Sequence, residues 1–241
     1  MSIADDCKTC GGARYYRVDV PMGHRLFGKA IPCPTCEVPR LRRVRAERLR
    51  RLSGVPEDLS RYTFANFYAD RARCSAQGRK DMQAIVEDVA RYAEHPDGWL
   101  VLHGTFGSGK THLAYAVVGR ALEAGRGVYY ASLPELLDTL KAGFEDDARM
   151  GYEERMRVMV ETELLVLDDL GAQARTAWSD EKLFEIVNYR YTRRLSLVVT
   201  TNLNLTDGGC PLEPRVLSRL NDVRLSRVLL LPAGDYRRTP A

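Results

Sequence analysis

Gly104-Thr105-Phe106-Gly107-Ser108-Gly109-Lys110-Thr111 is the stretch that decides the fold of this 241-residue chain. It fits the pattern G-x-x-x-x-G-K-[ST], follows an apolar run and begins a helical pattern. Glycines let backbone N–H groups surround phosphates, and a helix N-terminus adds positive potential. We therefore predict a nucleotide site in which Lys110 faces the β- and γ-phosphates and the Thr111 hydroxyl ligates Mg²⁺. The alternative is a glycine-rich turn without a ligand, which does not account for this placement between strand and helix.

The rest of the chain supports a parallel sheet around this loop. Five short apolar runs lack polar alternation, as expected of strands that are buried on both faces. These runs are 99–103, 128–131, 164–167, 197–200 and 228–231. Helical patterns alternate with them near 110–124, 134–143, 147–162, 178–193 and 212–221. We predict an α/β fold, a P-loop three-layer domain with a five-stranded parallel sheet.

Polar groups follow two of these apolar runs. Asp168 and Asp169 come directly after 164–167, so they are expected at the carboxyl edge of the sheet, where ligands bind. Asp168 would hold Mg²⁺ with Thr111, and Asp169 would orient or deprotonate the attacking water. Asn202 follows 197–200, where its amide would contact that water or the γ-phosphate. A solvated Asp pair and a Thr/Asn turn cap are the alternatives.

Two C-x-x-C pairs stand near the N-terminus, separated by 22 residues. They are Cys7 with Cys10, and Cys33 with Cys36. Two such knuckles joined by a hairpin form a tetrahedral Cys₄ zinc site. A module of about 35 residues cannot build an adequate core, so a metal would stabilise it. A redox-active pair is the alternative, but it needs a thioredoxin-like βαβ setting that this segment lacks.

Charge divides the chain into three parts. Residues 37–52 contain seven arginines and two glutamates, a net charge of +5, whereas the whole chain carries only +4. We predict a zinc-binding module over 1–36, an Arg-rich linker helix over 37–54 and an ATPase domain over 55–241. The arginines suit phosphates of a nucleic acid, and a solvated linker is the alternative.

Composition excludes several classes of protein. With 45% hydrophobic and 28% charged residues, the chain is not disordered, collagen-like or a coiled coil. It contains no apolar run of about 18 residues, and its first residues do not form a signal peptide. We therefore expect a cytoplasmic protein without a membrane partner, in which the cysteines are metal ligands or free thiols.

Several motifs together resemble a known family. They are the P-loop, 164–171 (LLVLDDLG), 200–202 (TTN), 215–220 (RVLSRL) and 234–237 (GDYR). They stand in this order in bacterial and phage helicase loaders of the DnaC/DnaI type, which are AAA+ ATPases close to the IstB transposition helpers. The resemblance covers about residues 53–241.

The resemblance implies roles for three further residues. Asn202 corresponds to sensor I, and Arg237 to the sensor II arginine. Arg219 corresponds to the arginine finger, which reaches a nucleotide in the neighbouring subunit, so the family resemblance implies self-association. An arginine suits both arginine roles because it is always charged and presents a fork to phosphate oxygens. The implied cofactors are ATP and Mg²⁺.

The resemblance also implies a function. We expect an ATP-dependent loader that places a replicative hexameric helicase on single-stranded DNA when replication begins. Some DnaI-type loaders carry an N-terminal zinc module and IstB proteins generally do not, which favours a loader. The alternatives are an IstB-like transposition helper, and a zinc-dependent nucleic-acid-binding module with a regulatory nucleotide pocket. A P-loop kinase would leave Asn202, Arg219 and Arg237 without a role.

Overall fold

The computed structural model of the chain describes residues 7–52, 54–69, 74–142, 152–205 and 208–236. The chain divides into two compact units, Met1–Arg48 and Leu49–Ala241. Helix α1 (Glu37–Leu52) crosses the boundary between them. The domain limits at residues 36 and 54 stay predictions.

The first unit is a small hairpin with two cysteine knuckles. Strands β1 (Tyr15–Tyr16) and β2 (Ile31–Pro32) pair antiparallel. The backbone N–H of Cys33 donates to the carbonyl of Arg14 at 2.7 Å. This pairing brings the second C-x-x-C close to the first, although 22 residues separate them in the chain.

Helix α1 begins directly after the second knuckle. Glu37 is buried in its first turn, where its carboxylate accepts from Arg40 Nε at 3.0 Å and from Arg40 Nη2 at 2.7 Å. Further along, Leu41 and Val44 are 40% and 56% exposed. Because its few described apolar side chains face solvent, this part of α1 has no packed apolar face.

The second unit contains a five-stranded parallel sheet, as predicted. Its strands are β3 (Trp99–His103), β4 (Val128–Ser132), β5 (Leu164–Leu170), β6 (Ser196–Thr201) and β7 (Ser226–Leu230). Their order is β4-β5-β6-β3-β7, and every neighbouring pair is parallel. All residues of β3 are buried, which explains its apolar run without polar alternation.

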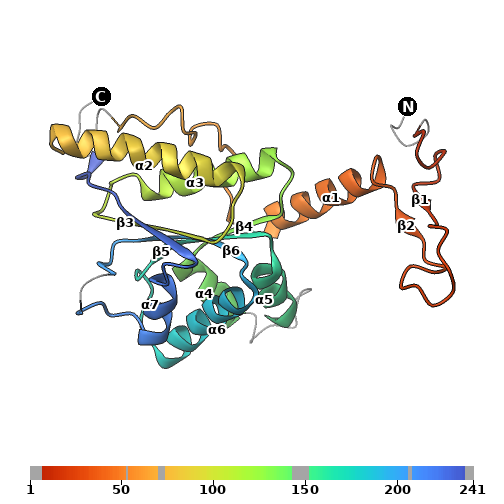
Figure 1. The fold of residues 1–241 in the computed structure, drawn as a ribbon. Helices are drawn as coiled ribbons and strands as arrows, with labels where there is room; N and C mark the ends of the chain where they lie inside the picture. The colour runs from red at the N-terminus through yellow and green to blue at the C-terminus, as the bar shows by residue number, and fades with distance from the viewer. Residues whose placement is uncertain (1–6, 53, 70–73, 143–151, 206–207, 237–241) are drawn as a thin grey trace. The chain divides into compact units, whose positions relative to one another are not determined.

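Helices cover both faces of this sheet (Figure 1). One face packs against α2 (Ala76–Glu94) and α3 (Lys110–Glu123). The other packs against α4 (Leu133–Ala142), α5 (Tyr152–Glu161), α6 (Ala177–Arg193) and α7 (Pro214–Leu220). The three-layer prediction is therefore confirmed. Among the described helices, none combines the length and the apolar character that crossing a membrane requires.

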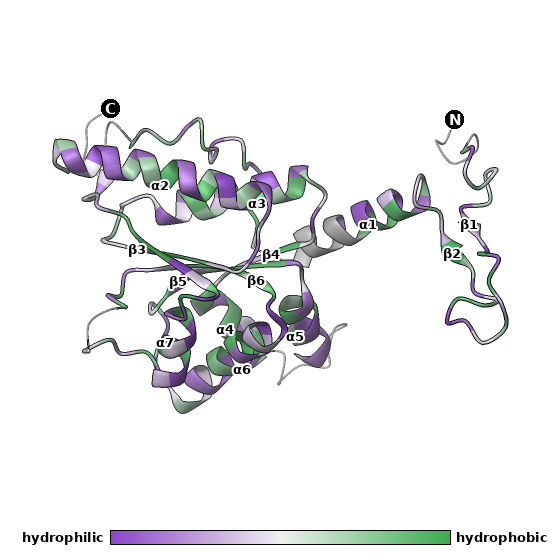
Figure 2. Cartoon of the chain, in the orientation of Figure 1, coloured by the Kyte–Doolittle hydropathy of each residue, from purple (hydrophilic) through white to green (hydrophobic). Residues whose placement is uncertain are grey.

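Helix α2 is the element that the sequence pattern did not predict. Its buried residues Met82, Val86, Val89 and Ala93 follow a helical period, but charged residues interrupt them. Figure 2 shows the resulting alternation of hydrophilic and hydrophobic bands along this helix. Its start is fixed by Ser75, whose hydroxyl accepts from the backbone N–H of Gly78 at 3.0 Å.

A fully buried arginine joins α6 to the sheet. Arg190 donates to the carbonyl oxygens of Val160 at 3.0 Å, Thr162 at 3.1 Å and Glu163 at 3.3 Å, and to that of Ser196. These carbonyls stand where α5 ends and where β5 and β6 begin. Burial lowers the pKa of Arg190 to about 10, so the group stays charged at neutral pH.

Candidate functional site

The P-loop connects β3 to α3, where the sequence predicts it. Gly107 and Gly109 have φ angles of +69° and +98°, which favour glycine. A Cβ on Gly107 would stand 2.0 Å from Oδ1 of Asp235, and one on Gly109 would stand 2.5 Å from the Phe67 ring. The loop therefore depends on glycine both for its backbone path and for the close approach of its neighbours.

Lys110 lies folded into this loop. Its Nζ donates to the carbonyl oxygens of Gly104 at 3.0 Å and Thr105 at 2.7 Å, and to the Ser108 hydroxyl at 3.3 Å. The side chain is buried, and the pKa of the adjacent His103 is lowered by burial and by the charge of Lys110. A positive charge is thus concentrated where the motif places the phosphates.

Asp168 is the last of five consecutive buried residues in β5, and both of its carboxylate oxygens accept from hydroxyl groups. Its Oδ1 accepts from the Thr111 hydroxyl at 3.2 Å and from the Thr200 hydroxyl. Its Oδ2 accepts from the Tyr130 hydroxyl at 2.8 Å. The structure therefore brings Thr111 and Asp168 together, although 56 residues lie between them in the printed sequence. Hydroxyl and carboxylate oxygens are the ligands that Mg²⁺ prefers, so this pair fits the ion.

Asp169 and Asn202 both line the cavity beside the P-loop. The pairing of β5 with β6 is irregular between Leu167 and Leu170, and Asp169 has a φ angle of +58°. The backbone N–H of Asp169 donates to the Thr200 hydroxyl at 3.0 Å. This local turn directs Asp169 to the same cavity as Asn202, and their roles toward water stay predictions.

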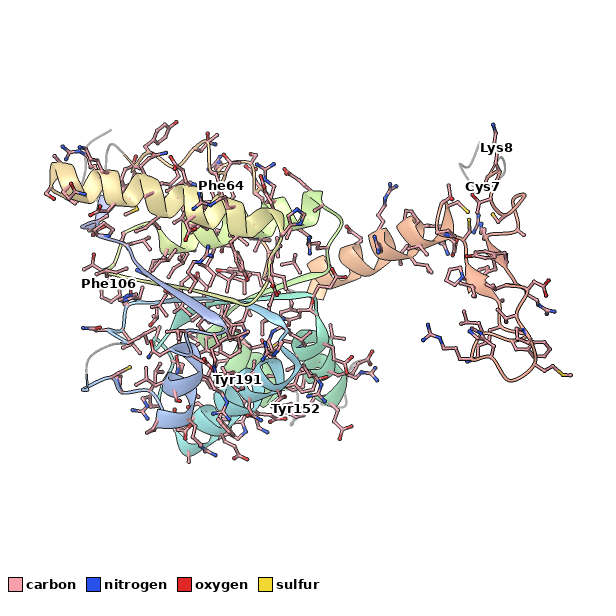
Figure 3. All side chains as sticks on the ribbon, in the orientation of Figure 1. Cys7, Lys8, Phe64, Phe106, Tyr152 and Tyr191 are labelled. Carbon is pink, nitrogen blue, oxygen red and sulfur yellow. The ribbon has the colours of Figure 1, made fainter. Side chains whose placement is uncertain are left out.

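The cavity has a volume of about 610 Å³ and an aromatic wall. The Tyr62 and Phe67 rings meet the His112 ring edge-on at 5.5 and 5.3 Å, and Tyr62 lies 4.9 Å from Tyr115. Such rings provide stacking surfaces for a planar base. Phe106 also borders the cavity but is 72% exposed (Figure 3). Sequence reasoning missed this wall, although Phe67 lies in the segment just upstream of α2.

The C-terminal segment packs on the P-loop. The Thr105 hydroxyl donates to the carbonyl of Ala233 at 2.7 Å, and the backbone N–H of Tyr236 donates to the carbonyl of Gly107 at 3.0 Å. Tyr236 lines the cavity. Arg237, the next residue, lies outside the described residues, so its sensor II role stays a prediction.

Arg219 is not among the described residues that line this cavity. It lies on α7, where its guanidinium donates to the Arg215 carbonyl at 2.9 Å and to Asn188 Oδ1 at 2.7 Å. Its guanidinium carbon is 4.9 Å from the centre of the Phe184 ring and 5.3 Å from that of Tyr191. Tyr191 packs on the side of the sheet covered by α4 to α7 (Figure 3). The role of Arg219 as an arginine finger stays a prediction.

The four predicted metal ligands come together in the first unit. The sulfurs of Cys7, Cys10, Cys33 and Cys36 all lie within 4.8 Å of one another. Cys7 and Cys33 are 3.8 Å apart, and Cys10 and Cys36 are 3.5 Å apart. A tetrahedral ion with bonds of about 2.3 Å separates its sulfurs by about 3.8 Å, whereas a disulfide needs about 2.05 Å. The spacing fits a metal ion and not two disulfides.

Backbone groups favour the thiolate form of Cys7, whereas burial and the neighbouring sulfurs raise the pKa of Cys36. The N–H groups of Cys10 and Thr9 lower the pKa of the Cys7 thiol to about 6. The backbone N–H of Arg14 donates to the Cys10 sulfur at 3.3 Å. Because the thiolate is the metal-binding form, these hydrogen bonds favour ligation.

The sequence model for the IstB-like ATP binding proteins matches residues 76–225, which include the P-loop, both aspartates, Asn202 and Arg219. The chain belongs to this family. The IstB-like proteins are AAA+ P-loop ATPases, so this IstB-like chain is an ATPase.

The curated relatives of the chain include a helicase loader and an insertion-sequence protein. It is 25% identical over 182 residues to the replicative helicase loader DnaC of Escherichia coli K12, covering 74% of this chain and 71% of DnaC. It is 31% identical over 142 residues to Rv3427c, an insertion-sequence protein of Mycobacterium tuberculosis, covering 57% and 55%. It is also 27% identical over 179 residues to YdaV of Escherichia coli K12, covering 74% and 69%. This chain thus spans only about half of Rv3427c.

Solved structures show the same fold. A crystal structure of the DnaC helicase loader aligns with a TM-score of 0.59 at 20% identity, covering 73% of this chain and 99% of that one. A crystal structure of DnaI aligns with a TM-score of 0.57 at 23% identity, covering 77% and 95%. These matches confirm the AAA+ fold of the second unit.

Proposed function

We propose that this IstB-like ATPase is an ATP-controlled loader, which places a replicative hexameric helicase on single-stranded DNA when replication begins. The observation that carries the proposal is that Arg219 is held by Asn188 on α6 and is not among the described residues that line the nucleotide cavity of its own chain. A site that needs a neighbour's arginine turns over ATP only in an assembly. ATP binding and hydrolysis would then control whether the subunits are assembled, which suits a loader better than a metabolic enzyme. The similarity to DnaC supports the same reading.

Within this proposal, each part of the site has a defined task. The loop N–H groups and Lys110 would bind the phosphates. Thr111 and Asp168 would hold Mg²⁺, which would screen the negative charge of the phosphates. Asp169 and Asn202 face the water that attacks the γ-phosphate. Arg219 of one subunit stabilises the charge that develops at the neighbour's nucleotide.

The first unit, which contains the four cysteines, is proposed to bind one Zn²⁺ and to contact the helicase. The sulfur spacings of 3.5 and 3.8 Å support a four-coordinate ion, and four thiolates suit zinc. Because the unit has little apolar core of its own, the ion would hold its two knuckles in place.

Co-purification tests the loader function directly. The tagged chain is mixed with the replicative helicase of its host, with AMPPCP and without nucleotide, and the complexes are separated by size. We expect a stable complex whose amount depends on whether nucleotide is present. We also expect single-stranded DNA to change the rate of ATP hydrolysis. A chain that hydrolyses ATP but never binds the helicase contradicts the proposal.

A transposition helper of the IstB type is the second candidate. The match to the IstB-like family and the 31% identity to the insertion-sequence protein Rv3427c favour it. It predicts binding to duplex DNA and no complex with the helicase, so the same co-purification separates the two. A zinc-dependent nucleic-acid-binding module with a regulatory nucleotide pocket is the third candidate, and an ATPase assay with and without single-stranded DNA separates it from both others.

A further inference from the structure

Tyr130 is a buried group beside the nucleotide site that no sequence motif indicates. It lies on β4, is 3% exposed, and donates its hydroxyl hydrogen to Oδ2 of Asp168 at 2.8 Å. In the sequence it is one residue of an apolar run. The parallel pairing of β4 with β5 brings it to the carboxylate, since Tyr130 pairs with Val166 and Ser132 with Asp168.

This hydrogen bond completes the contacts of the Asp168 carboxylate. Thr111 and Thr200 donate to Oδ1, so Tyr130 is the described donor to the second oxygen. A carboxylate only accepts hydrogen bonds, so the phenol hydroxyl is the donor and Asp168 the acceptor.

The ring of Tyr130 packs against one neighbouring ring, and its backbone is held by a hydrogen bond. The ring of Tyr115 lies 4.7 Å away, and Tyr62 lies 4.9 Å beyond Tyr115. Tyr62 and Tyr115 belong to the aromatic wall of the nucleotide cavity, whereas Tyr130 is not among its described lining residues. The backbone carbonyl of Tyr130 also accepts from the N–H of Gly54 at 2.9 Å. A row of three rings thus runs from the cavity wall to Asp168.

We propose that Tyr130 is a positioning residue, which holds the Asp168 carboxylate in the orientation that Mg²⁺ requires when nucleotide is bound. Its hydroxyl fixes Oδ2 and thereby keeps Oδ1 toward Thr111. It acts through Asp168 and does not contact the nucleotide. This inference rests on the proposed Mg²⁺ site at Thr111 and Asp168.

The Tyr130→Phe variant isolates the hydroxyl, because it keeps the ring and its packing. Partners that orient a metal ligand typically contribute 10- to 100-fold to metal affinity or activity. Tyr129→Phe is a matched control on the same strand. Tyr129 is also buried, but it packs on the opposite face of the sheet, with the cluster of α4 to α7.

The experiment measures the affinity for AMPPCP by calorimetry, with and without Mg²⁺, in buffer free of chelators that would remove zinc. The dissociation constant without Mg²⁺, divided by the one with Mg²⁺, reports how strongly Mg²⁺ and nucleotide support each other's binding. We expect Tyr130→Phe to lower this ratio by about tenfold, with the Mg²⁺-free affinity unchanged. Tyr129→Phe should keep the wild-type ratio. In ATPase assays, the Tyr130→Phe rate should recover at high Mg²⁺.

Three outcomes would overturn the inference. A wild-type ratio in Tyr130→Phe, even with a lowered melting temperature, shows that Tyr130 only packs. A higher ratio shows that its hydroxyl competes with Mg²⁺ for Asp168. If the wild-type protein binds AMPPCP equally well with and without Mg²⁺, both the Mg²⁺ site and the role of Tyr130 are overturned. This third outcome shows in the wild type, so it is distinguished from the first two, which show only in Tyr130→Phe.

Discussion

The guanidinium of Arg219 on α7 donates a 2.7 Å hydrogen bond to the side-chain oxygen of Asn188 on α6. Phe184 and Tyr191, which flank the same guanidinium, stand four residues before Asn188 and three after it. At this spacing the three side chains share one face of α6. Helix α6 therefore holds Arg219 outside the described lining of the nucleotide cavity of its own chain, as the proposed role toward a neighbouring subunit requires.

Arg219→Ala should leave the ATP affinity of the isolated chain nearly unchanged and remove hydrolysis in the assembled state. In GTPases, an arginine supplied by a second protein contributes about 10³–10⁵ in rate, so the loss should be plain. Nucleotide binding is measured by calorimetry, and hydrolysis under conditions in which the wild type is assembled and active. Arg120→Ala is the control, because Arg120 is an exposed arginine on α3.

Mixing two inactive variants tests whether the arginine acts between subunits. Arg219→Ala subunits keep an intact pocket, and Lys110→Ala subunits can still donate Arg219. Mixed assemblies should regain part of the activity. If purified Arg219→Ala hydrolyses ATP at the wild-type rate, Arg219 is only a surface residue.

Lys110→Ala should abolish ATP binding. The change removes the buried ammonium group that now contacts Gly104, Thr105 and Ser108 and that would face the β- and γ-phosphates. A hydrogen bond to a charged group contributes about 1.5–3 kcal/mol, so losing the lysine's contacts to both the β- and γ-phosphates should lower the affinity by more than about a hundredfold. Calorimetry with ATP and Mg²⁺ measures it, with the exposed Lys80→Ala as control. Unchanged affinity contradicts the assignment of the phosphate site.

One zinc ion should bind per chain through Cys7, Cys10, Cys33 and Cys36. Elemental analysis of protein purified without chelator measures the stoichiometry, and Cys33→Ser should lower it while Cys210→Ser should not. Removing the ion should unfold residues 7–36, because zinc contributes about 10–16 kcal/mol in zinc-finger peptides. The second unit, which contains the nucleotide site, should keep its melting transition. A metal-free protein with an intact hairpin would show that the cysteines are not ligands.

Local signals made much of the fold predictable. Four of the five apolar runs predicted strands because burial on both faces removes polar alternation, whereas β7 is an edge strand whose residues are half-buried or exposed. The P-loop and the two C-x-x-C pairs were readable because their chemistry needs fixed spacings within a few residues. Thr111 and Asp168 meet as predicted because both stand at the carboxyl edge of one sheet.

Contacts that depend on strand order were not predictable. Tyr130 reaches Asp168 only because β4 pairs with β5, and apolar runs carry no information on which strands are neighbours. The turn at Asp169 depends on an irregularity in the pairing of β5 with β6. Helix α2 was missed because charged residues interrupt its apolar period. Asn188 and Arg190 look like ordinary polar residues of a helix, and only tertiary packing shows what they contact.

Arg190→Met should destabilise the ATPase unit without changing its chemistry. Methionine fills much of the same volume but leaves four carbonyl oxygens, those of Val160, Thr162, Glu163 and Ser196, without their donor. We expect a loss of about 2–4 kcal/mol, which lowers the melting temperature of a domain of this size by roughly 5–15 °C. Arg193→Met is the matched control, three residues further on the same helix, where the arginine is exposed and lies over the Tyr189 ring. Differential scanning calorimetry compares the two variants, and AMPPCP affinity below the transition shows whether the site survives. If both variants melt together with the wild type, the buried arginine does not hold α6 to the sheet.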